Sequence, residues 1–415
     1  MPVAAAFIRI FSALLLGIPI VLAFTYYLVA TAADATLLDP DFVASSFQRS
    51  GYYDRVYSEV LLRPEFSDWT GSFIGGFEVA GDERAQLLED LAPTSYLQEE
   101  AERNITALLL HLTGSRDDLE LYIDLNTPLL NSGPATLEFV DQRIEELESV
   151  AVSSPEELTT EVVTFLRTLN AGTLPIHAPS ADAITVERRI QAYQEALDTI
   201  EGDGAVSSQA MGSLRQSESE ALALIGQDKM REALKLSGRS VTEARIEQAR
   251  TFILDRSNAV HRLNLVDQFA EANNRTPTQI RRDARILGLI LRAATSSIAQ
   301  WVGLSIAVLC VLGIALLFIP YWKHVIFWPS VILLLSGMLL LLTAFGTTLE
   351  TSYWASVLCK GRDLSHCTLT LDVLREVAVG VRSGLVDGAL KILVIGSIGL
   401  ILAFVVSRMF RHKTS

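Results

Sequence analysis

The amino-acid sequence predicts a mainly α-helical membrane protein. It has four transmembrane helices and a large, mostly helical extracytoplasmic domain with at most a small β element. Two neighbouring 22-residue stretches, 298–319 and 325–346, contain no charged residue. Each would form a helix about 33 Å long, enough to cross a hydrocarbon core of about 30 Å. Apolar stretches at residues 10–30 and 385–407 supply the other two spans.

The four apolar stretches divide the chain into nine predicted segments. They are a cytoplasmic N-terminus (1–9), transmembrane helix 1 (10–30), an extracytoplasmic helical domain (31–296), transmembrane helix 2 (297–319), a cytoplasmic turn (320–324), transmembrane helix 3 (325–346), an extracytoplasmic loop (347–384), transmembrane helix 4 (385–407) and a cytoplasmic tail (408–415).

Basic residues give mixed signals about the orientation in the membrane. Arg9, Lys323 in the turn and the basic tail favour the cytoplasm for the two termini. Basic residues in 281–292 and in the 347–384 loop argue for the reverse orientation. Because long domains cross membranes largely regardless of charge, the basic residues in 281–292 weigh less than those in the 347–384 loop. The signal-like N-terminus and a cysteine pair in the loop then favour an outer domain.

The first apolar stretch has a second interpretation as a removable signal peptide. Ala30-Thr31-Ala32 fits the small-x-small pattern of a cleavage site. The apolar run is longer than the usual signal core of roughly 7–15 residues, and only one arginine precedes it. An uncleaved anchor is therefore the favoured interpretation.

Charge is distributed very unevenly along the chain. Residues 34–296 hold 43 of the 48 acidic and 24 of the 34 basic residues, so this segment carries a net charge of −19. Such a charge argues against nucleic acid or anionic lipid as a ligand of the domain. It favours a basic or polar protein partner, although a solvated surface explains it as well.

Amphipathic stripes and capping residues predict a domain built mostly of helices. The expected helices cover residues 95–113, 134–147, 155–169, 186–200 and 211–236, with one more capped by Ser240. Alternating apolar residues at 119–125 predict a strand, and residues 262–266 are its candidate partner.

Two groups of residues stand out near the membrane. The first is a juxtamembrane set that could contact lipid phosphates: Arg281, Arg282, Arg285 and Arg292. The alternative is a helix that simply continues into the membrane, with its arginines solvated or paired. The second group has small side chains at helix-packing spacing: Ala299, Gly303, Ala307, Gly384 and Gly388. It predicts close packing of helices, within the span cluster or with another chain.

The sequence contains no recognised catalytic motif. The zinc-protease H-E-x-x-H, the hydrolase G-x-S-x-G and the phosphate-binding G-x-x-x-x-G-K-[ST] patterns are all missing. No catalytic, cofactor-binding or metal-ligating residue is therefore assigned, and no cofactor is expected. A metal site formed by Cys359, Cys367, His366 and Asp363 is a weak alternative to a disulfide, because a second histidine is absent.

Two segments suggest a distant resemblance. LLDPDFVASSFQRSGYYDRVY (37–57) and SYLQEEAERNITALLLHLTGSRDDLELYIDL (95–125) resemble a group of uncharacterised bacterial membrane proteins. These are similar in having one anchor, a helical outer domain and a C-terminal cluster of spans. The resemblance implies a location in the bacterial plasma membrane and no particular activity.

The expected function is non-catalytic. We expect an envelope protein whose outer domain binds, senses or scaffolds. Its expected partners are membrane lipids and a membrane or envelope protein, a second copy of the chain included, and no nucleic acid. One alternative is a permease-like subunit of a mechanotransmission ABC system. Such subunits are similar to this chain in the order of one span, a large outer domain and three further spans. The other is an extracytoplasmic enzyme without a recognisable motif.

The loop between spans three and four generates a testable prediction. Cys359 and Cys367 share this loop, so on an oxidising face they can form a disulfide. Mass spectrometry under non-reducing conditions should find the linked peptide in protein from intact cells. Cys310 lies within a span and should remain reduced, which makes it an internal reference. Two free thiols at Cys359 and Cys367 would contradict both the bridge and the outer placement of the loop.

Overall fold

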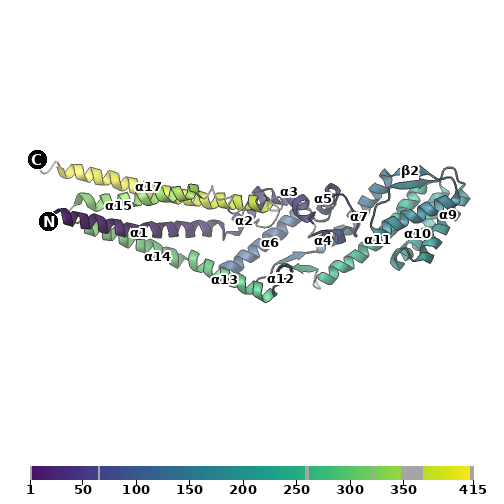
Figure 1. Cartoon of the computed structure of the whole chain (residues 1–415), viewed down its shortest axis with the longest axis horizontal. Helices are drawn as coiled ribbons and strands as arrows, with labels where there is room; N and C mark the ends of the chain where they lie inside the picture. The colour runs from purple at the N-terminus through teal and green to yellow at the C-terminus, as the bar shows by residue number, and fades with distance from the viewer. Residues whose placement is uncertain (1, 64–65, 258–260, 320–321, 347–367, 412–415) are drawn as a thin grey trace. The chain divides into compact units, whose positions relative to one another are not determined.

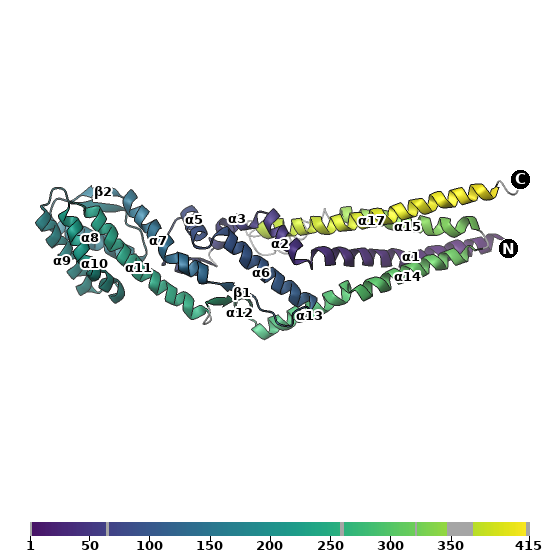
Figure 2. The same cartoon turned by 180° about the vertical axis from the view of Figure 1, so that it is seen from behind.

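The computed structural model describes residues 2–63, 66–257, 261–319, 322–346 and 368–411 (Figures 1 and 2). Helices make up 81% of it, which confirms the prediction of a mainly α-helical protein. Backbone contacts divide the chain into two units. We call residues 1–52, 101–121 and 266–415 the span unit, and residues 53–100 and 122–265 the helical unit.

The span unit contains the helices that are long and apolar enough to cross a membrane. Its helices are α1 (Pro2–Thr36), α2 (Pro40–Arg49), most of α6 (Thr94–Thr113), nearly all of α12 (Leu265–Ala272), α13 (Pro277–Thr295), α14 (Ser297–Leu317), α15 (Trp322–Gly346) and α17 (Thr368–Arg411). Four candidate spans lie at Phe11–Thr36, Pro277–Leu317, His324–Phe345 and Thr368–Val406. The prediction of four membrane-crossing helices is therefore confirmed as far as length and apolar character allow.

The four spans pack as an uneven bundle. α1 and α15 each pack against all three other spans, and α15 follows α17 for most of its length (Figure 1). α14 and α17, by contrast, have little contact with each other among the described residues. They therefore occupy opposite corners of the bundle.

The fourth span begins well before the predicted position. α17 is 44 residues long and starts at Thr368, so the predicted loop over 347–384 is wrong for its last 17 residues. Charged residues interrupt the apolar run in this region, which hid the helix. Its early part packs on α2, where Phe42 meets Gly380 and Arg49 Nε lies 3.5 Å from a carboxylate oxygen of Glu376.

A break separates α13 from the second span. Ser296 has an extended ψ of 142° and ends α13, and its Oγ accepts a hydrogen bond from Ala299 N to cap α14. α13 itself begins with a capping box between Thr276 and Gln279. The two helices are thus separately capped, and α13 is not a plain continuation of the span.

The helical unit consists of short helices followed by a bundle of longer ones. It holds α3 (Tyr52–Val56), the π-helix η1 (Tyr57–Leu61), α4 (Ser67–Phe73), α5 (Gly81–Leu91), α7 (Asn126–Glu146), α8 (Pro155–Ala171), α9 (Val186–Asp203), α10 (Ser208–Gly226) and α11 (Met230–Arg256). Its main core lies among α7 to α11. Tyr193 is fully buried there, and its hydroxyl lies 2.6 Å from Ser237 Oγ; burial raises its pKa to about 12.

Two small sheets complete the helical unit. β1 (Tyr122–Asp124) pairs antiparallel with β4 (Arg262–Asn264), which confirms the strand and the partner predicted from the sequence. β2 (Glu148–Ala151) pairs in parallel with β3 (His177–Ser180), and α8 forms the connection between them. The second sheet was not predicted, because its strands are short and one of them contains a proline.

Two predicted helix starts are wrong. Pro134 lies inside α7, which begins at Asn126. Ser240 lies inside α11, where its hydroxyl contacts Leu236 O at 3.3 Å and Ser217 Oγ at 3.0 Å instead of capping a new helix. Pro134 itself is exposed, but Leu129 and Val140 on either side of it are buried and keep α7 continuous. Ser240 is tolerated because its hydroxyl bonds within and between helices.

Arg245 of α11 joins two separate backbone segments of the helical unit to its own helix. Its guanidinium donates to the carbonyl oxygens of Gly75, Gly76 and Asn170, and it lies over the ring of Phe77. Burial lowers its pKa. Gly172, at φ 85°, caps α8 beside this group, where a Cβ would collide with the Gly76 carbonyl. The arginine therefore holds the end of α8 and the loop after α4 on α11.

We expect Arg245→Met to loosen this junction, because three carbonyls lose a charged donor. The local free energy of unfolding should fall by about 2–4 kcal/mol. Hydrogen exchange of the full chain should show faster exchange around residues 75–77 and 170–173. Arg250→Met on the same helix is the control; its nearest acid, Glu247, is 3.9 Å away, so the change should stay within about 0.5 kcal/mol. Equal protection in both variants would contradict the role assigned to Arg245.

Candidate binding sites

The exposed ridge of α7 separates two hollows in the helical unit. Pro134, Glu138 and Gln142 follow one another at intervals of four residues and are all exposed. They line both hollows. The hollow on one side of the ridge is completed by α5, and the hollow on the other side by α11. We call these the α5 hollow and the α11 hollow.

The α5 hollow has a volume of about 840 Å³ and is strongly acidic. Its acidic lining residues are Glu83, Glu89, Asp90, Glu138 and Glu146, and Arg143 is its only basic one. The Arg143 guanidinium pairs with Glu83 and lies 3.0 Å from a carboxylate oxygen of Glu146. Glu89, Asp90 and Glu138 are exposed and have no ion-pair partner among the described residues. The hollow therefore carries uncompensated negative charge.

The α11 hollow has a volume of about 650 Å³ and a more balanced lining. Asp141 is almost completely buried there and pairs with the Arg239 guanidinium, whose pKa this hydrogen bond raises. The ammonium of Lys235 lies 3.6 Å from a carboxylate oxygen of Glu145. Because Glu138 and Glu243 also line this hollow, its acids still outnumber its bases.

Together the two hollows form a negatively charged surface along α7. Eight acidic and three basic residues line them, which leaves a net charge of −5. Leu130, one turn before Pro134 on the same helix, is 70% exposed. Such a surface suits a cationic partner that also offers an apolar side chain.

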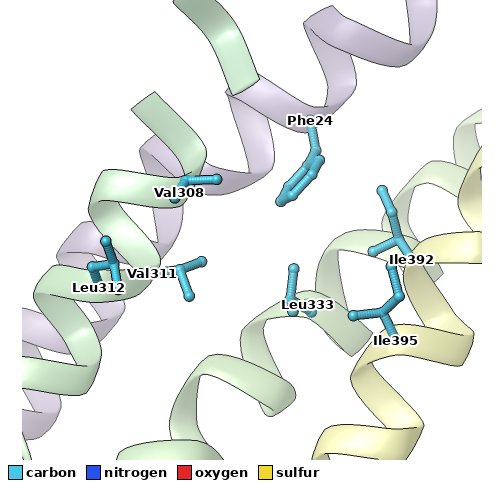
Figure 3. Close-up of a pocket in the computed structure, with 7 residues that line it drawn as sticks. All are labelled: Phe24, Val308, Val311, Leu312, Leu333, Ile392 and Ile395. Carbon is cyan, nitrogen blue, oxygen red and sulfur yellow. The ribbon is translucent and has the colours of Figure 1, made fainter. Parts of the chain in front are cut away.

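A different cavity lies among the spans (Figure 3). It has a volume of about 230 Å³ and takes side chains from all four spans. Its lining residues are Phe24 of α1, Val308, Val311 and Leu312 of α14, Leu333 of α15, and Ile392 and Ile395 of α17. Every one of them is apolar, so this cavity and the α7 hollows differ completely in chemistry.

The structure places the juxtamembrane arginines on α13. Arg281, Arg282 and Arg285 are exposed, while Arg292 is half-buried and its Nε donates to Gly288 O at 3.3 Å. The same helix exposes four large apolar side chains: Ile286, Leu287, Leu289 and Ile290. Gly288 itself is buried against Leu112 of α6. Exposed charge and exposed apolar surface thus occur together on this helix.

The small residues of the spans lie at contacts between helices. A Cβ added at Gly303 would lie 3.3 Å from the Tyr26 ring, and one at Gly384 would lie 3.3 Å from the Cβ of Ala32. Gly388 faces Leu28 in the same way. Ala307 is fully buried and Ala299 is partly buried. All three glycines therefore pack against α1.

The remaining predicted residues lie elsewhere. Cys359 and Cys367, together with the alternative metal ligands Asp363 and His366, fall outside the described residues. Within the described part of the chain, no group of three or more histidine, cysteine or acidic residues is arranged to hold a metal ion. The α7 hollows were missed because their acids come from three helices; their only signal in the sequence was the acidic charge of the domain.

These features define the chain as a helical protein with four candidate membrane spans, a separate helical unit and an acidic surface on that unit. Comparison with protein-family models, curated proteins and solved structures found no match.

Proposed function

We propose that this protein is a non-catalytic membrane protein whose helical unit binds a basic segment of a partner protein along α7. The observation that carries the proposal is the α5 hollow, where Glu89, Asp90 and Glu138 are exposed and lack ion-pair partners among the described residues. A cationic partner would supply the missing counter-charges. Because these carboxylates are already exposed to solvent, most of the gain would be in association rate and specificity.

The shape of the hollows supports a protein partner over a small substrate. Small-molecule sites are usually concave, mostly apolar pockets with a few polar groups. The α5 and α11 hollows are instead open and polar, and they share a ridge of exposed side chains. An extended segment could lie across this ridge and place lysines or arginines on both sides. Leu130 offers an apolar contact at one end of the ridge.

The proposal places the helical unit outside the cytoplasm and treats α1 as a retained anchor. The packing of α1 against the other three spans supports retention, because cleavage would remove the helix that Gly303, Gly384 and Gly388 contact. The basic tail and Lys323 support the orientation. The plasma membrane of a bacterial cell is the location that this arrangement suits.

Charge reversal in the α5 hollow tests the proposed binding. The double variant Glu89→Lys/Glu138→Lys should weaken binding of a lysine- and arginine-rich peptide to the full-length protein in nanodiscs by about tenfold. Fluorescence anisotropy at two salt concentrations is the measurement, and raised salt should weaken wild-type binding as well.

The matched control is Glu195→Lys/Glu220→Lys, which makes the same charge change at exposed positions outside both hollows. It should reduce binding much less. If both double variants weaken binding equally, the peptide responds to net charge alone, and the assignment of a site along α7 is wrong.

Protease accessibility tests the orientation. Protease added to intact spheroplasts should digest residues 36–296 and leave a C-terminal tag protected, because that tag follows the cytoplasmic tail. The same tag should become sensitive once the membrane is permeabilised, which shows that it can be cut. Digestion of the tag in intact spheroplasts, with the helical unit protected, would reverse the proposed orientation.

A further inference from the structure

We propose that the cavity among the four spans binds one acyl chain of a bilayer lipid, which enters sideways between α14 and α17. This inference is independent of the function proposed for α7. The cavity lies where the bundle is least closed, since α14 and α17 have little contact among the described residues. In Figure 3 the α14 side chains face those of α17 across the cavity, with Phe24 and Leu333 between them.

The walls of the cavity exclude water as its occupant. A buried water needs two to four polar partners, and apolar cavities of comparable size stay dry. Here all seven lining side chains are hydrocarbon. The volume of about 230 Å³ exceeds that of an apolar cavity of about 150 Å³ known to bind benzene. A hydrocarbon guest therefore fits, and an empty cavity would leave the lining atoms without contact partners.

The mouth of the cavity opens towards lipid. Val308 and Leu312 on α14 and Ile395 on α17 are 49%, 53% and 59% exposed. The inner wall is closed, because Ile392 is only 6% exposed. The cavity is thus reached from the outer surface of the span bundle.

The depth of the cavity identifies the molecules that can reach it. Val308 lies ten residues after Ile298, which is about 15 Å along the helix and near the middle of a hydrocarbon core of about 30 Å. Lipid tails are the material found at that depth. A headgroup would have to leave the interface to enter, so the occupant is the distal part of a chain.

The surroundings favour a lipid over a neighbouring helix. Membrane helices associate closely through small residues. In this bundle Gly303, Gly384 and Gly388 already contact α1. The residues at the mouth are branched and bulky (Val308, Leu312 and Ile395). A flexible chain can thread between such side chains, whereas a helix of a second copy cannot approach them closely.

Photolabelling tests the proposal on the full-length protein. Nanodiscs would contain a phosphatidylcholine with a diazirine near the end of one acyl chain, and labelled residues would be located by mass spectrometry. We expect labelling of Ile392, which the annular lipids around the protein do not reach. Leu333→Trp should fill the cavity and reduce the labelling of Ile392 by about tenfold. Leu335→Trp, the same change at an exposed position on α15 that does not line the cavity, should leave it unchanged.

A second pair of variants, on α14, keeps the test valid if Leu333→Trp fails to fold. Leu312→Trp obstructs the mouth from α14, and Leu309→Trp is its matched control, because Leu309 is 66% exposed and lies outside the lining. Leu312→Trp should lower the labelling of Ile392 while Leu309→Trp should not. Labelling confined to exposed residues such as Leu309 and Leu316, or labelling of Ile392 that persists in both filled variants, would overturn the proposal.

Discussion

The packing of three helices against α1 is the interaction on which the span unit depends. Side chains in a bilayer gain little by leaving lipid for one another, so spans associate through close packing. Gly303, Gly384 and Gly388 permit that approach at three positions along α1. The Tyr26 hydroxyl adds a hydrogen bond of 2.6 Å to Ala294 O at the junction of α13 and α14. The first span is thus an integral part of the bundle.

The same packing leaves one part of the bundle open. α1 and α15 contact each other, for example where Gly17 meets Ile332, and both also contact α14 and α17. When α1 and α15 touch across the middle of a four-helix bundle, the other two helices, α14 and α17, are held apart. The remaining pair stays apart, and large side chains such as Phe24 only partly fill the space between them. The cavity is therefore a consequence of which helices pack most closely.

The helical unit is stabilised by different means. A hydrophobic core forms among α7 to α11, and the buried Tyr193 hydroxyl within it pairs with Ser237. Arg245 adds polar connections, because it binds backbone carbonyls of the loop after α4 and of the end of α8. The exposed face of α7 therefore does not contribute to this core. Its acids can therefore accumulate without destabilising the core, provided that water or a partner solvates them.

Regular patterns allowed much of the fold to be predicted from the sequence. The four apolar stretches, the capped start of α8 at Ser154 and the strand character of β1 all follow from short-range rules of length, capping and alternation. Those rules failed at Pro134 and Ser240, where packing outweighs local preference, and at the start of α17, where charged residues mask a continuing helix.

The sequence by itself determined that the chain has four apolar helices and an acidic helical domain, because composition and periodicity are local properties. Only the tertiary structure decided where acids gather and where a cavity forms. The α7 hollows combine residues separated by up to 160 positions, from Glu83 to Glu243. The span cavity combines Phe24 with Ile395. No spacing rule connects such residues, since their proximity depends on how helices pack and not on their order along the chain.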